Sequence, residues 1–163
     1  MTGRIELRWG LIIGAANLIW LYGSYYLGMH TSGLAMIQMV MLASLLFPVV
    51  GYVPAMRSIA RVVPDMSFIE GIRSGAIIVG IVAVFAVISQ LGYHKFIFPE
   101  FTEYMAGEIG KYYQDQGLTE VEDGARQTFG LRSCLIQSAL GAMMVGMITI
   151  TVFMGVFCLR RRA

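Results

Sequence analysis

The chain has 163 residues, of which 57% are apolar and only 13% are charged, whereas soluble domains carry roughly 25% charged residues. A soluble fold of this composition would expose much apolar surface to water, so an ordinary soluble domain is excluded and an integral membrane protein is favoured. The net charge of +2 is small and gives no support to nucleic-acid binding.

Four segments are long and apolar enough to cross a bilayer, which takes about 20 residues per helix. They cover about residues 9–28, 33–56, 72–93 and 134–159. They lack the alternating pattern of a membrane barrel, and lipid admits only helices or closed barrels. The sequence therefore predicts an all-α, polytopic integral membrane protein, with four transmembrane helices in one domain over residues 1–163.

The first segment follows Arg4 and Arg8, as the apolar part of a signal peptide would. However, no small-residue cleavage site follows the segment, which ends in Tyr25 and Tyr26. We therefore expect the first segment to be retained as a membrane anchor.

The second segment carries Pro48 and Pro54. Proline has no backbone N–H, so Pro48 predicts a kink in the helix. Pro54 is expected to mark the point where the regular helix stops, close to the predicted end of the segment at residue 56.

The third segment opens with a predicted capping box, in which Ser67 caps the helix and Glu70 reaches back to the N–H of Ser67. Gly71 and Gly75 follow on one helix face and would allow a neighbouring helix to approach closely. Structural roles are therefore expected for these residues in preference to catalytic ones.

Residues 94–133 form a long loop that separates the third and fourth segments. Apolar residues recur at helical spacing after Pro99, which predicts an amphipathic helix on the outer membrane surface. Thr119 and Glu122 have capping-box spacing, so a second short helix is expected to start there.

Lysine and arginine are distributed unequally between the two predicted sides of the membrane. The N-terminal tail, the second loop and the C-terminus carry eight basic residues, and the other side carries four, in a loop with seven acidic residues. Cytoplasmic flanks are enriched in lysine and arginine, so we expect both termini in the cytoplasm and the long loop outside.

Small residues recur at four-residue spacing and would make shallow grooves for helix packing. The candidates are Gly10 with Gly14, Ala76 with Gly80, and Ser138 with Ala142 and Gly146, besides Gly71 and Gly75. These grooves are expected mainly to pack the four helices together, with docking of a partner helix as the alternative.

Two histidines, His30 and His94, are predicted at the outer membrane face. A metal site there would need a third ligand such as Glu100, and the commoner role of such residues is in an aromatic belt with neighbouring tyrosines. We expect no metal and no cofactor. Cys134 and Cys158 would lie roughly 36 Å apart on one helix, too far for a disulfide.

Four amides lie in or near the predicted spans: Asn17, Gln38, Gln90 and Gln137. They are expected to bond across helix interfaces, with lining of a substrate path as the alternative. No acidic residue or lysine occupies the centre of a span, which weighs against a proton-coupled transporter.

Three short motifs have a familiar order and spacing along nearly the whole chain. They are Gly10-Leu11-Ile12-Ile13-Gly14, Ser67-Phe68-Ile69-Glu70-Gly71 with Gly75, and Phe98-Pro99-Glu100-Phe101. In these features the chain resembles a bacterial family of small four-span membrane proteins known as domain of unknown function 4199. The resemblance implies the four-span architecture and a bacterial inner membrane, and it supplies no activity, substrate or functional residue.

Three classes of function remain open. The favoured one is an accessory or interaction subunit in the lipid bilayer that packs against another membrane protein. The alternative is a small homo-oligomeric channel or transporter, which polar groups facing a shared cavity would support. The third class, an enzyme acting on a lipid or quinone at the outer face, is not expected, because it would need His30, His94 and an outer carboxylate to converge.

Overall fold

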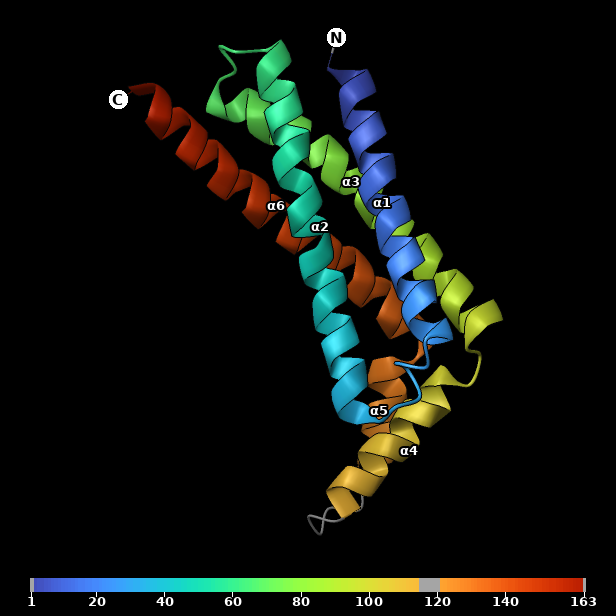
Figure 1. Ribbon diagram of the computed structural model, residues 1–163. Helices are drawn as coiled ribbons and strands as arrows, with labels where there is room; N and C mark the ends of the chain where they lie inside the picture. The colour runs from blue at the N-terminus through green and yellow to red at the C-terminus, as the bar shows by residue number, and fades with distance from the viewer. Residues whose placement is uncertain (1, 115–120, 163) are drawn as a thin grey trace.

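The computed structural model describes residues 2–114 and 121–162, and within them all the regular secondary structure is helical. The elements are α1 (Gly3–Tyr26), α2 (Leu34–Val62), α3 (Phe68–Gly92), the π-helical turn η1 (Tyr93–Ile97), α4 (Phe101–Gln114), α5 (Glu122–Phe129) and α6 (Leu131–Arg162). The predicted all-α class is confirmed. Four long helices make up the body, with α4 and α5 at the end opposite the two termini (Figure 1).

Three of the long helices have the length and apolar composition needed to cross a membrane. These candidate spans are Leu34–Val62, Phe68–Ile97 and Leu131–Arg160. The remaining long helix, α1, has 24 residues but is less apolar, because it includes Asn17 and several aromatic residues. Within residues 2–114 and 121–162, three candidate spans therefore stand against the four that the sequence predicts.

Two predicted helix boundaries differ from the structure. The prediction that Pro54 ends the second helix is wrong, since α2 continues to Val62. Tyr52, Met56 and Ile59 are buried on both sides of Pro54, and their packing holds the helix together despite the missing N–H.

The second boundary is the start of α5. The predicted cap residue Thr119 lies outside the described residues, and Glu122 is the first residue of α5, with Val121 at the cap position and no side-chain cap. By contrast, α4 begins at Phe101, directly after Pro99 and Glu100, as an amphipathic helix.

The four long helices form a ring in which each helix packs against two neighbours. The most extensive interfaces are those of α3 with α6 and with α1, and α2 closes the ring by packing against α1 and α6. The helix pair α2 and α6 shares the smallest of the four interfaces. This pair is therefore the most open side of the ring.

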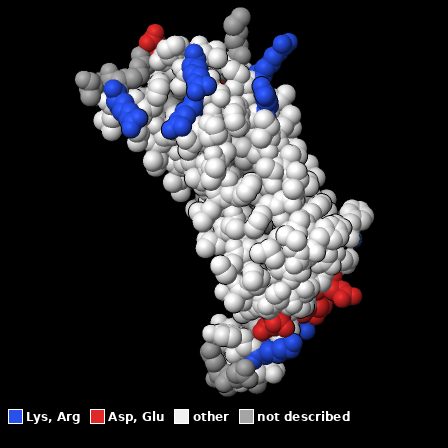
Figure 2. All heavy atoms as spheres, viewed as in Figure 1, with Lys and Arg blue, Asp and Glu red and all other residues white. Residues whose placement is uncertain are grey.

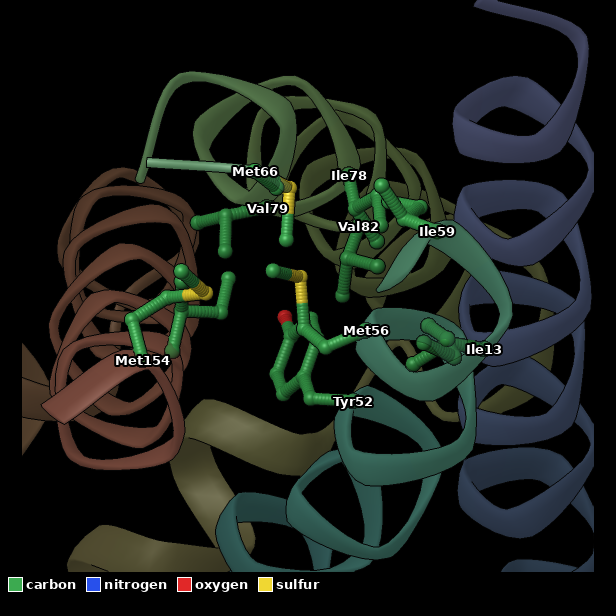
Figure 3. Packing of buried hydrophobic residues seen from close by; sticks show 11 residues of the cluster. Ile13, Tyr52, Met56, Ile59, Met66, Ile78, Val79, Val82 and Met154 are labelled. Atoms are coloured by element: carbon green, nitrogen blue, oxygen red, sulfur yellow. The ribbon is translucent and has the colours of Figure 1, made fainter. Parts of the chain in front are cut away.

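Buried apolar side chains gather in two clusters at different heights of the bundle. The inner cluster, nearer the termini, includes Ile13, Tyr52, Met56, Val79 and Met154, which converge from all four long helices (Figure 3). The outer cluster lies beneath α4 and is formed by Ile37, Tyr93, Phe101, Met105 and Cys134.

Charged side chains lie at the two ends of the molecule. In the view of Figure 2, the end that carries the termini is mainly basic, the opposite end carries acidic and basic residues, and the long middle section is uncharged. Such an apolar middle section with charged ends is typical of a protein embedded in a bilayer.

Candidate binding cavity

A cavity of about 290 Å³ lies between the four long helices, in the half of the bundle nearer α4 and α5. Its walls are mainly aliphatic and aromatic, but every long helix also contributes polar side chains. The polar lining residues are Asn17, His30, Ser44, Ser89, Gln90, Tyr93, Cys134, Gln137 and Ser138. Among the residues that the structure describes, the lining includes no aspartate, glutamate, lysine or arginine.

Two residues of the lining have a buried side-chain oxygen with no hydrogen-bond partner. The hydroxyl of Ser89 is unpaired although the residue is only 2% exposed, and Oδ1 of Asn17 is both buried and unpaired. Trp20 Nε1, Tyr52 OH and His94 Nε2 are also unpaired, but those residues do not line the cavity. An unpaired buried polar group destabilises a fold by roughly 1–3 kcal/mol, so the two lining oxygens mark a place where a partner is missing.

Asn17 and Ser89 lie at about the same height of the bundle. The helices α1 and α3 run in the same direction, with Gly14 against Phe85 and the Tyr22 hydroxyl donating to the Ser89 carbonyl at 3.2 Å. Asn17 is three residues beyond Gly14 on α1, and Ser89 is four residues beyond Phe85 on α3, so the two residues lie at similar heights. The two unpaired oxygens therefore belong to one belt.

α6 brings Gln137 to the same belt. This helix runs antiparallel to α3, with Gly146 against Val79, so following both helices outward brings Gln137 level with Ser89. The amide nitrogen of Gln137 donates to the Thr128 carbonyl at 3.2 Å. On α3 the next residue, Gln90, lines the cavity as well, whereas Gln38 is exposed and outside the cavity.

The α2 wall contributes a further acceptor through Pro48. Pro48 is buried, lines the cavity beside Ser44, and has no N–H to donate to the Ser44 carbonyl one turn earlier. The Ser44 hydroxyl donates to the Val40 carbonyl at 2.9 Å. The wall therefore holds a backbone carbonyl that lacks its helical partner.

A chain of hydrogen bonds closes the outer end of the cavity around His30. The Ser24 hydroxyl donates to the Leu21 carbonyl at 2.9 Å and lies 2.8 Å from His30 Nε2. Because the hydroxyl proton is engaged, Nε2–H donates to Ser24, and His30 Nδ1 accepts from the Tyr93 hydroxyl. Burial lowers the pKa of His30 to about 4, so the ring is neutral at pH 7.

His94 is placed differently from His30. Its Nδ1 lies 3.1 Å from the Gln90 carbonyl, and its ring packs edge-on against Phe101. The two histidines flank Tyr93 with ring centroids 5.2 Å and 5.8 Å from it, but no carboxylate joins them. In residues 2–114 and 121–162, no group of three or more histidine, cysteine or acidic residues could hold a metal ion.

The outer helices form a roof over the cavity. Phe101 of α4 and Phe129 at the end of α5 both line it. The Thr102 hydroxyl donates to the Phe129 carbonyl at 3.1 Å, and Arg126 of α5 pairs with Glu103 of α4 at 3.0 Å. Since the arginine pair is exposed, the aromatic packing contributes most of the roof's stability.

The predicted packing glycines lie mostly at helix contacts within the chain. An added Cβ at Gly10 or Gly14 would collide with Ile81 or Phe85 of α3, and one at Gly71 or Gly75 with α6. Gly146 is likewise covered, by Val79 and Tyr52.

The other small residues have different surroundings. Ser138 and Ala142 line the cavity, whereas Ala76 and Gly80 are exposed on α3. At the start of α3 the Ser67 hydroxyl accepts from the Glu70 N–H, and the Ser67 N–H donates to the Glu70 carboxylate at 2.8 Å.

Sequence reasoning did not single out Ser44 or Ser89. Serine is common in membrane helices, where its hydroxyl usually bonds the preceding turn, as Ser44 does. Ser89 departs from this pattern. The one feature of the sequence that could have indicated its role is the neighbouring amide of Gln90.

The family model described as protein of unknown function DUF4199 matches residues 8–159, and the chain belongs to this family. No curated protein matches the chain. No solved structure matches it either.

Proposed function

We propose that this member of the DUF4199 family is a membrane-embedded binding protein that holds a lipid-like small molecule in the cavity between its four long helices. The observation that carries the proposal is the belt of polar groups from all four helices around one cavity, with two buried oxygens unpaired. Water is scarce inside a bilayer, so such groups need a protein or ligand partner.

The proposed function is the binding or carriage of a small molecule, as in a transporter. It is not conduction through an open pore. The inner cluster fills the half of the bundle below the cavity with buried side chains from all four helices. A channel through one copy would need that cluster to be absent. The proposal includes no catalysis, because both ring nitrogens of His30, the nearest candidate base, are engaged by Ser24 and Tyr93.

The proposal includes α1 as a fourth membrane span. A helix of 24 residues is about 36 Å long, enough for a hydrocarbon core of about 30 Å. Packing of α1 along α3 supports this placement. The basic end that carries both termini would then face the cytoplasm, and the membrane would be a bacterial inner membrane.

A second candidate function is the accessory role, in which the protein packs against another membrane protein or a second copy. Ala76 and Gly80 favour it, because they form an exposed strip of small residues on α3 that no other helix of the chain covers. Purification in mild detergent would reveal a stoichiometric membrane-protein partner that the variant Gly80→Leu loses.

The binding proposal is tested by native mass spectrometry of the protein purified in mild detergent, with identification of retained small molecules. Ala142→Phe places a ring inside the cavity, and Ala76→Phe places the same ring on the exposed face of α3. We expect a retained molecule in the wild type and in Ala76→Phe, and its loss in Ala142→Phe. Retention by all three proteins, or by none, would count against the proposal.

A further inference from the structure

We infer that the cavity selects an uncharged amphipathic molecule whose head carries an O–H or N–H donor and whose apolar chain leaves between α2 and α6. This inference rests on the proposed function and adds the chemical class of the ligand.

The head needs a hydrogen-bond donor because the unpaired groups in the belt are mostly acceptors. Oδ1 of Asn17 only accepts, and the Ser44 carbonyl lacks the N–H that Pro48 does not supply. The Ser89 hydroxyl can donate or accept. A hydroxyl or amide head would therefore satisfy Asn17 and Ser89 together, whereas an ether or ester oxygen would leave Asn17 unpaired.

The head is uncharged because nothing in the cavity would compensate a charge. No ionised side chain of the described residues lines it, and His30 is neutral at pH 7. Moving an isolated carboxylate or ammonium group into such surroundings costs several kcal/mol or more. A fatty acid anion or an amine is therefore disfavoured relative to an alcohol or amide of the same chain length.

The chain leaves through the most open side of the ring. Met41 and Leu45 of α2 line the cavity and are also 37% and 42% exposed, so their side chains reach from the cavity to the lipid-facing surface. Gly141 of α6 also lines the cavity and faces Leu45 closely, so the flexible Leu45 side chain is the group that would have to move to let a chain pass. A cavity of about 290 Å³ holds a head and the first part of a chain, with the rest in lipid.

The inference is tested with three probes of equal chain length: hexadecan-1-ol, its methyl ether and palmitate at pH 8. Binding to the purified protein is measured in detergent at matched mole fractions, by the shift of the unfolding temperature and by native mass spectrometry. We expect the alcohol to bind at least about tenfold more tightly than either of the other probes, since the ether lacks the donor and palmitate is charged.

Substitutions in the cavity test which residues cause the preference for the alcohol over the ether. Asn17→Leu is expected to bring the affinities for alcohol and ether within about threefold of each other, whereas Ser89→Ala is expected to weaken the binding of both and to keep the preference for the alcohol. Ser58→Ala, a serine of α2 outside this cavity whose hydroxyl bonds the Pro54 carbonyl, is expected to keep the full preference.

The outcomes separate the inference from the proposed function. Equal binding of alcohol and ether, or tighter binding of palmitate, would overturn the inferred ligand class while leaving the cavity as a binding site. If none of the three probes binds and no molecule is retained from the membrane, the proposed function fails as well.

Discussion

At the scale of single residues, the outer half of the bundle depends on a few buried polar side chains. Tyr93 and His30 join the turn between α1 and α2 to the outer end of α3, with Ser24 completing the chain of bonds. Tyr93 is 1% exposed and also contacts the rings of Tyr25 and Phe101. Its hydroxyl therefore orders the residues that close the cavity.

Tyr93→Phe tests this role. The substitution removes one hydroxyl and leaves His30 Nδ1 buried without its donor, so we expect the free energy of unfolding to fall by about 1–3 kcal/mol. Unfolding in mild detergent measures the change. Tyr26→Phe is the matched control, because Tyr26 is 75% exposed, and we expect it to change stability by less than about 0.5 kcal/mol.

The pKa of His30 predicts a pH dependence of stability. Burial holds this pKa at about 4 in the folded state, below its ordinary value of 6.5. Between these values the unfolded chain binds more protons, so the free energy of unfolding should rise with pH from 4 to 6.5, by at most about 1.4 kcal/mol per pH unit.

The variant His30→Gln isolates this contribution from that of the acidic residues. We expect the wild type to lose more stability than His30→Gln on acidification from pH 7 to pH 4. Parallel pH profiles for the two proteins would show that His30 is not buried as described.

At the scale of the helices, α3 is the central element, since it has the most extensive interfaces with α1 and α6. Glycines allow α1 and α6 to approach α3 closely. Gly71 and Gly75 lie under Met154 and Ile150 of α6, and Ile150 is fully buried and cannot easily move aside. Close helix approach at small residues is the common way to pack helices in membranes.

Gly75→Ala and Gly80→Ala test this packing on one helix. The new Cβ at position 75 would collide with Ile150, so we expect a loss of about 1–3 kcal/mol in the free energy of unfolding. At position 80 nothing lies within 4 Å, and alanine favours a helix more than glycine does, so we expect no loss. Equal effects of the two substitutions would contradict the described α3–α6 interface.

The sequence predicts those elements that depend on neighbouring residues in the chain. The capping interactions of Ser67 and Glu70 span one helical turn, and the apolar spacing after Pro99 was enough to locate α4. The end of α2 was mispredicted, because tertiary packing around Met56 and Ile59 overrides the local effect of Pro54.

The cavity could not be predicted in the same way. Asn17, Ser89 and Gln137 lie on three helices far apart in sequence, and whether each of them lines the cavity depends on how its helix is rotated in the bundle. Gln38 has the same chemistry and points elsewhere, to the exposed face of α2. The sequence identifies amides in apolar segments, and only the packed structure tells which of them share a cavity.

At the scale of the whole molecule, the proposed topology places residues 4 and 61 on the same side of the membrane. We expect Arg4→Cys and Arg61→Cys, in a chain with Cys134 and Cys158 replaced by serine, to react with a membrane-impermeant maleimide only after cells are permeabilised. Lys111→Cys should react in intact cells. Reaction of Arg4→Cys in intact cells would mean that α1 does not cross the membrane as proposed.

The most direct test of the account is to locate a bound amphipath in the folded protein. A long-chain alcohol with a photoreactive diazirine near its head would be added to the purified protein, irradiated, and mapped by peptide mass spectrometry. We expect labelling of residues that line the cavity, such as Leu21, Ala86 and Val145, and suppression of this labelling by excess hexadecan-1-ol. Labelling confined to lipid-facing residues such as Ile19 and Val84, and not reduced by hexadecan-1-ol, would show that the cavity does not bind the alcohol.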